Sequence, residues 1–147
     1  MSLKELRTKF DAMKADMQAQ MKVAFVKESM DLFNRYPDMM GFSWEQYTPY
    51  FNDGEPCEFR VYEYSVKVNR ENEYSYAGRY TTTVLHEGEE PRLEIIEAPK
   101  EFKDACKDVK DLITSVDHEL MQMTYGDGYE IMVHRDGKIT TSECDHD

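Results

Sequence analysis

Several features that would assign a class of protein are missing from this sequence of 147 residues. No apolar run approaches the roughly 20 residues that a membrane-spanning helix needs. The start of the chain, MSLKELRTKF, is charged where a secretion signal would be apolar. The only cysteines are Cys57, Cys106 and Cys144, and no CxxC pair occurs, which favours free thiols in a reducing compartment. The sequence therefore predicts a soluble, cytoplasmic protein.

Basic residues are scarce, since 18 Lys and Arg stand against 30 Asp and Glu and give a net charge of −12. This balance argues against direct binding to nucleic acid or to an anionic membrane, because phosphate contacts need clustered Lys and Arg. Residues 1–36 carry seven basic and five acidic side chains, which leaves 11 basic and 25 acidic side chains for the rest. Such an excess can attract a basic partner, repel DNA, or keep the protein soluble.

Recognisable catalytic patterns are also absent. The sequence has no Ser–His or Cys–His pairing and no nucleophile elbow. Four consecutive residues, Cys144, Asp145, His146 and Asp147, carry metal-binding side chains, but zinc usually takes three or four well-spaced ligands on ordered backbone. A polar tail is the simpler interpretation. We therefore expect no enzyme, no cofactor and no metal.

The pattern of apolar residues predicts one α+β domain over residues 1–147. Ser2 and Glu5 form a capping-box pattern, and apolar residues then recur at helical spacing as far as Tyr36, just before Pro37. This indicates a long N-terminal helix over residues 1–36. A helix of that length can bury only part of itself against a small sheet, so its first half is a candidate for pairing in a homodimer.

From Cys57 the apolar period changes to two, which is typical of strands. We expect a bulge near Val61, because the phase of the alternation slips there, with Tyr62, Tyr64, Val66 and Val68 following on the other parity. Asp136-Gly137 between two β-like runs is a strong hairpin signal. The prediction is a mainly antiparallel sheet of about five strands, with a second amphipathic helix before a C-terminal β-hairpin. The elements expected after the first helix are strands at 57–68, 74–85 and 92–97, a helix at 99–126, and hairpin strands at 129–135 and 138–142.

The densest stretch is WEQYTPYFNDGEPCEF, residues 44–59, with the only tryptophan and two of the five prolines. Its successive turn residues favour a connection whose aromatic side chains plug one end of the sheet. The functional alternative is a binding loop, because loops often carry function and tyrosines with carboxylates suit a contact surface. The candidate binding residues are Trp44, Tyr47, Tyr50, Asn52, Asp53 and Glu55, together with Arg60, Tyr62, Tyr64 and Arg79 on neighbouring strands.

The segment Trp44-x-Gln46-Tyr-Thr-Pro-Tyr-Phe-Asn-Asp-Gly54-x-Pro56-Cys57-x-Phe59 resembles one found in small, uncharacterised proteins of tailed bacteriophages. It covers about a tenth of the chain, and Arg135-Asp-Gly137 with the closing His146-Asp147 gives weaker support. The resemblance implies an accessory protein that works in the cytoplasm of an infected bacterium. Small phage proteins of this kind often bind and inhibit a host defence or regulatory factor.

Two alternatives remain open. Seven of the ten tyrosines lie between Tyr47 and Tyr80, and stacked tyrosines could hold a small nucleotide if a local positive groove accompanies them. That groove would use Arg60, Lys67, Arg70 and Arg79. In the other alternative a row of carboxylates imitates the phosphates of DNA. The row would contain Glu71, Glu73, Glu87, Glu89, Glu90, Glu94 and Glu97.

Overall fold

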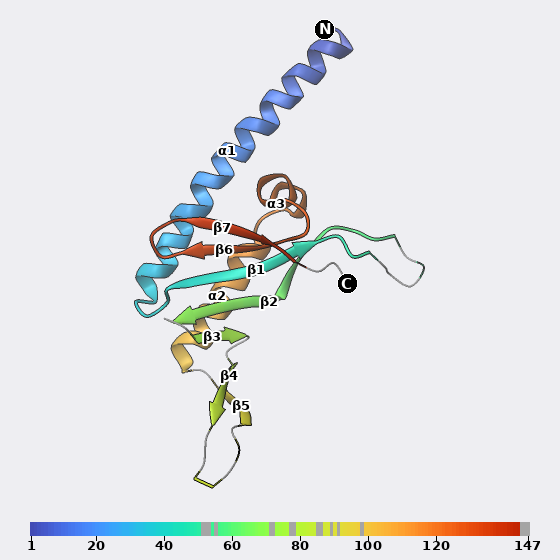
Figure 1. Ribbon diagram of the computed structural model, residues 1–147. Helices are drawn as coiled ribbons and strands as arrows, with labels where there is room; N and C mark the ends of the chain where they lie inside the picture. Colours follow the sequence, from blue (N-terminus) through green and yellow to red (C-terminus); the bar gives the residue numbers. More distant parts are fainter. Residues whose placement is uncertain are drawn as a thin grey trace.

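The computed structural model describes residues 1–50, 54, 56–70, 73–76, 79–84, 87, 88, 90, 92–97 and 99–144, and for 70, 73–76, 79–84 and 92–97 it describes the backbone alone. Figure 1 shows a sheet, helices packed beside it, and a long first helix that projects away from both. The helices are α1 (Leu3–Arg35), α2 (Lys100–Thr114) and α3 (His118–Tyr125). The strands are β1 (Gly41–Tyr47), β2 (Arg60–Arg70), β3 (Glu73–Tyr76), β4 (Arg79–Val84), β5 (Arg92–Glu97), β6 (Tyr129–His134) and β7 (Ile139–Glu143).

The described strands form one sheet in the order β5-β4-β3-β2-β1-β6-β7, and every neighbouring pair is antiparallel. The predicted α+β class and antiparallel sheet are therefore confirmed. The number of strands is seven rather than about five, because β1 was not expected and the strand expected at 74–85 is divided into β3 and β4. The helices pack on the part of the sheet formed by β2, β1 and β6.

The first helix confirms the prediction closely, with 33 residues from Leu3 to Arg35. The hydroxyl of Ser2 accepts a hydrogen bond from the backbone N–H of Glu5 at 3.1 Å, which satisfies one of the unpaired amides of the first turn. Tyr36 leaves the helical conformation directly before Pro37. None of the described helices, this one included, is long and apolar enough to span a membrane.

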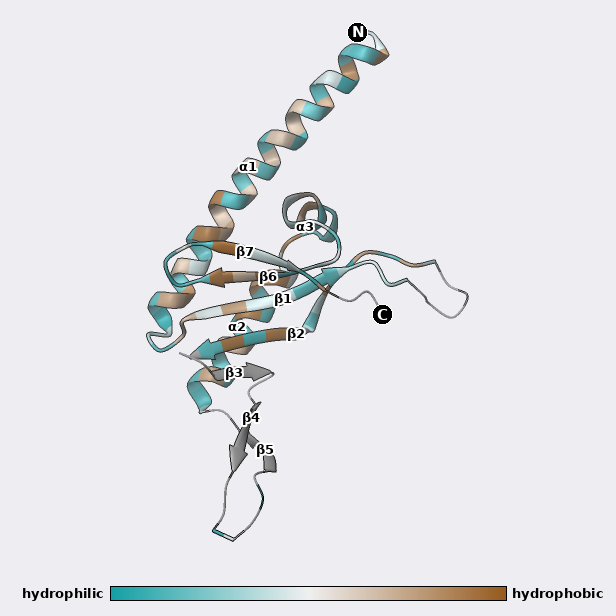
Figure 2. Cartoon of the chain, viewed as in Figure 1, coloured by the Kyte–Doolittle hydropathy of each residue, from teal (hydrophilic) through white to brown (hydrophobic). Residues whose placement is uncertain are grey.

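Strand β1 lies at the centre of the sheet, between β2 and β6, and so the prediction of a turn-rich plug beginning at Trp44 is wrong for residues 44–47. Phe42 and Trp44 point to the helices: the Trp44 ring lies 5.5 Å from that of Phe25 in α1, and the Phe42 ring 5.7 Å from that of Phe33. Figure 2 shows hydrophobic residues concentrated where α1 meets the sheet. Buried polar residues, Ser43 and Gln46 among them, concealed the strand because they interrupt its apolar pattern.

The expected irregularity in β2 exists, but it lies beyond Val61. Ser43 pairs with Lys67 and Glu45 pairs with Tyr62, so two steps along β1 match five along β2. The Ser65 hydroxyl fills the gap by accepting from the Glu45 N–H at 2.8 Å. As a result Val61 and the later valines of β2 face the helices, whereas Tyr62 lies on the other face, contrary to the expected phase.

The helix expected at 99–126 is two helices, because the chain breaks at Ser115 and Asp117 starts α3. The Asp117 carboxylate accepts from the N–H groups of Glu119 and Leu120 at 2.9 and 3.3 Å, as a helix cap does. Because Val116 continues the apolar stripe across the break, the sequence pattern did not reveal the break. The predicted hairpin is confirmed, with Gly137 at a φ of 89° between β6 and β7.

Candidate functional site

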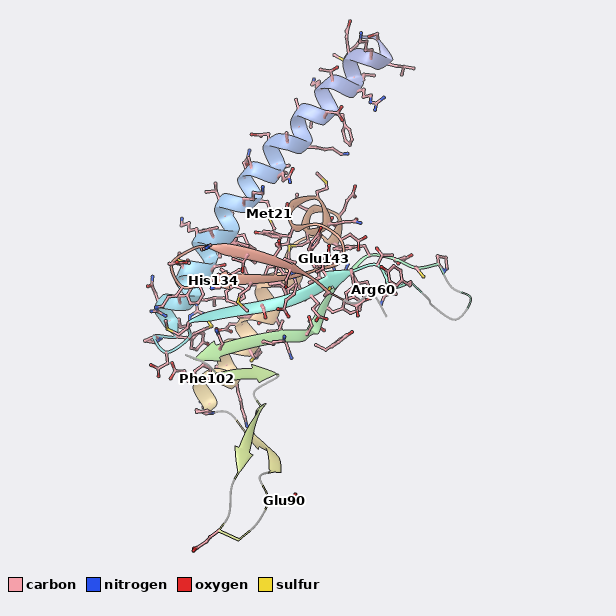
Figure 3. All side chains as sticks on the ribbon, in the orientation of Figure 1. Met21, Arg60, Glu90, Phe102, His134 and Glu143 are labelled. Carbon is pink, nitrogen blue, oxygen red and sulfur yellow. The ribbon has the colours of Figure 1, made fainter. Side chains whose placement is uncertain are left out.

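The sheet presents two different faces. Trp44 and Gln46 of β1 point to the helices, whereas Glu45 between them and Tyr47 after them point the other way. Directly paired residues of neighbouring strands share a face, and Tyr47 pairs with Arg60 while Glu45 pairs with Tyr62. We call this second surface the open face, since no described helix packs on it. Figure 3 labels Arg60 at the start of β2, beside the end of β1.

Three tyrosines pack together at this end of the open face. The ring of Tyr47 stacks on that of Tyr62 with centroids 4.2 Å apart, and the ring of Tyr64 meets that of Tyr62 edge-on at 5.4 Å. The hydroxyls of Tyr47 and Tyr64 lie 3.3 Å apart. Tyr47 is only 5% exposed, whereas Tyr64 is 66% exposed. This tyrosine cluster, Tyr47, Tyr62 and Tyr64, therefore has a buried base and an exposed edge.

The residue after β1 ties the cluster to the rest of the molecule. Thr48 donates from its N–H and its hydroxyl to the two carboxylate oxygens of Asp127, at 2.8 and 2.7 Å. Gln122 of α3 donates to the same carboxylate at 3.2 Å. Asp127 stands between Gly126 and Gly128, both with φ above 90°, so a left-handed turn aims it at the strand end. The cluster is thus held on ordered backbone.

Burial and electrostatics together raise the pKa values of Tyr47 and Tyr62 and keep these two hydroxyls neutral. Burial raises the pKa of Tyr47 above its usual value, and the nearby Tyr64 and Glu45 raise it further. Burial also raises the pKa of Tyr62, with Arg60 acting in the opposite direction. Protonated tyrosines can donate and accept hydrogen bonds, so the arrangement suits binding by contact and hydrogen bonding.

Four of the predicted site residues, Tyr47, Arg60, Tyr62 and Tyr64, come together on the open face. Trp44 does not: it is fully buried on the helix side, where its indole N–H donates to the Gln46 side chain at 2.9 Å. Its assignment to a binding surface is wrong, because no partner can reach it in this fold.

The remaining predicted site residues differ in how much of them the structure describes. Tyr50 is 75% exposed and follows the end of β1. Asn52, Asp53 and Glu55 lie outside the described residues. The backbone of Arg79 pairs with Tyr76 and Glu97, and its side chain is outside the description.

Two residues that hold the site, Asp127 and Gln46, were not predicted from the sequence. Gln46 is fully buried and donates to the carbonyls of Met121 and Gly126 at 3.0 and 2.8 Å, which joins β1 to the middle of α3 and to the residue directly after it. The Gly-Asp-Gly sequence at 126–128 was the available signal for Asp127, since Asp between glycines favours a turn. No sequence signal marked Gln46, because its partners are distant in the chain.

The positive groove expected for a nucleotide is weakened by one ion pair. The ammonium group of Lys67 lies 2.9 Å from a carboxylate oxygen of Glu130, and both side chains are about four-fifths buried. Within the described ranges, no three His, Cys, Asp or Glu side chains gather closely enough to hold a metal ion. Of the proposed carboxylate row, Glu87 and Glu90 are described with their side chains, and both are exposed.

Comparisons with protein-family models, with curated proteins and with solved structures found no match to this chain. The chemistry of the tyrosine cluster is therefore inferred from its own geometry.

Proposed function

We propose that this is a binding protein whose tyrosine cluster, with Arg60 beside it, occupies a surface of a partner protein. The observation that supports this proposal is the exposed Tyr64 ring held against Tyr62, which is in turn stacked on the buried Tyr47. Tyrosines that are already packed lose little freedom on binding, and tyrosine and arginine are common in interface hot spots.

The charges around the cluster favour a basic partner. Glu45 and Asp127 act on the tyrosines from the sheet and the adjoining turn, and Arg60 is the cation that acts on Tyr62. With Lys67 neutralised by Glu130, a phosphate-bearing nucleotide would meet more negative than positive charge. The net charge of −12 acts in the same direction at longer range. The resemblance to tailed-phage proteins makes a host protein the expected partner, and inhibition by occupying its surface the expected mode of action.

The test compares three proteins: wild type, Tyr64→Ala, and Met40→Ala as a control that truncates another exposed apolar side chain. Each is incubated with host lysate, and bound proteins are identified and then titrated in purified form. A partner retained by wild type and Met40→Ala but weakened at least about tenfold by Tyr64→Ala would support the proposal. Equal binding by all three would refute the cluster as the contact surface. An added mass of nucleotide size in native mass spectrometry would favour the sequestering alternative instead.

A further inference from the structure

The first half of α1 carries a stripe of large apolar side chains that nothing in the described structure covers. We call it the α1 stripe: its five members, spaced three and four residues apart, are Leu3, Leu6, Phe10, Met13 and Met17. Their exposed fractions run from 48% to 86%. Figure 3 shows this half of the helix standing clear of the molecule, with Met21 labelled where the helix reaches it. Such a stripe is unfavourable in water and indicates a contact surface.

The α1 stripe does not continue the face with which the helix packs on its own sheet. At about 100° per residue, the stripe is centred roughly 90° around the helix from the buried side chains of residues 21–33. Gln18, on the core-facing side, donates to the Met123 carbonyl at 2.8 Å and fixes that orientation. The chain's own body therefore cannot cover the stripe by continuing the same contact. The spacing also changes, from alternating threes and fours to steps of four after Met17, and the first pattern is that of two helices packed side by side.

We propose that the α1 stripe pairs with the α1 stripe of a second copy, in antiparallel orientation, with residue 3 opposite residue 20. This register places Leu6 opposite Met17 and Phe10 opposite Met13, so that apolar side chains meet across the contact. The overlap ends directly before Met21, the first residue that α1 buries against its own body. The whole stripe, from Leu3 to Met17, therefore lies within the overlap.

Charge favours the antiparallel orientation over the parallel one. Residues 1–20 carry four basic and three acidic side chains, so the rest of the chain has 14 basic and 27 acidic ones. Antiparallel pairing sets each slightly basic helix start beside the acidic body of the other copy. Parallel pairing would set the two acidic bodies side by side, which costs electrostatic energy.

The charged residues that flank the α1 stripe also favour the antiparallel over the parallel orientation. In the antiparallel register Lys9 meets Asp16 of the second copy on one side of the contact, and this pair forms twice. On the other side Arg7 meets Lys14 of the second copy, with Asp11 of each helix next to both. In a parallel pair Lys9 would instead meet Lys14 of the second copy on both sides, which places like charges together.

The mass of the full-length protein is the first measurement. We expect sedimentation equilibrium to give twice the chain mass of 17.4 kDa at high concentration, and one chain mass for the double variant Phe10→Glu, Met13→Glu. The matched control is Ala12→Glu, Ala15→Glu, which adds the same charge to exposed positions away from the stripe and should remain dimeric. A monomeric wild type, or a dimer that survives Phe10→Glu, Met13→Glu, would overturn the proposal.

A cross-linking experiment tests the orientation. With Cys57 and Cys144 replaced by serine, the variants Phe10→Cys and Met13→Cys are mixed and oxidised. Antiparallel pairing should give the mixed disulfide between positions 10 and 13, whereas a parallel pair would give only 10–10 and 13–13 disulfides and would refute the register.

A third experiment measures binding to phosphatidylglycerol vesicles. It tests an anionic membrane as the alternative occupant, because the first 20 residues carry four basic side chains. A monomer that gains vesicle binding through the α1 stripe would identify a membrane surface as the occupant and overturn pairing. This proposal is independent of the tyrosine cluster, and Tyr64→Ala should leave the dimer intact.

Discussion

The two halves of α1 belong to one continuous helix, yet they have different surroundings. From residue 21 onward the helix buries Phe25 against Trp44 and Tyr125, and Phe33 against Phe42. Before residue 21 it exposes side chains of similar size and hydrophobicity, Phe10 among them. Local sequence suffices to make both halves helical, but burial depends on which side of the helix carries the apolar residues. One continuous helix thus contributes its second half to the core and leaves the apolar side chains of its first half exposed.

The largest effect should come from truncating a ring in the buried half. Phe25 is 2% exposed and touches two other aromatic rings, so Phe25→Ala removes a core side chain and leaves a cavity. We expect the free energy of unfolding to fall by about 3–5 kcal/mol. Denaturant titration followed by tryptophan fluorescence would measure it, since Trp44 is adjacent. A loss below about 1 kcal/mol would mean that the buried half is not packed as described.

A smaller effect should appear at alkaline pH, at the end of the buried half. The Tyr36 hydroxyl donates to Asp108, and burial together with that carboxylate raises the pKa of Tyr36 to about 12. Because the folded state holds this proton more tightly than the unfolded state, its stabilising contribution is complete below pH 10 and declines as the pH rises towards 12.

Thermal unfolding from pH 8 to 12 would measure this decline. Tyr36→Phe should make the decline shallower without removing it, because Tyr47 and Tyr62 also have raised pKa values. Tyr50→Phe, at a position 75% exposed, should leave the decline unchanged. An unchanged slope in Tyr36→Phe would contradict the assignment.

The junction between the halves should respond more weakly. Gln18 holds α1 to α3 through one hydrogen bond to the Met123 carbonyl. Gln18→Ala should lower the free energy of unfolding by about 0.5–1.5 kcal/mol, the usual net contribution of such a bond. Hydrogen exchange gives the sharper measurement, with faster exchange expected around residues 15–20. Unchanged exchange would show that the bond does not anchor the helix.

The smallest effect on the folded body is expected from the exposed half. Phe10→Ala should change the free energy of unfolding of the monomer by no more than about 0.5 kcal/mol, because Phe10 contacts none of the buried core. The measurement needs protein dilute enough to be monomeric, since the same substitution should weaken the proposed pairing. A large loss in the monomer would remove the distinction between the two halves.

For the tyrosine cluster, the sequence predicted some of the residues on the open face correctly and others incorrectly. Tyr47, Arg60, Tyr62 and Tyr64 were chosen for their chemistry and do share the open face, whereas Trp44 was chosen for the same reason and is buried. Tyr47 and Trp44 lie on opposite faces because three steps along a strand reverse the direction of a side chain. The turn-like composition after Tyr47 concealed the strand, and with it this difference.

What the sequence determined by itself is the local structure: the length of α1, its Ser2 cap, and the hairpin at Asp136-Gly137. These features depend on residues within a few positions of one another. Tertiary structure alone decided that β1 is a central strand and that Gln46 is buried. The side-chain amide of Gln46 donates to the carbonyls of Met121 and Gly126, which lie 75 and 80 positions further along the chain. A buried polar group is tolerated only where distant partners satisfy it. The local spacing of apolar residues carries no information about those distant partners. The central strand β1 therefore could not be predicted from the sequence.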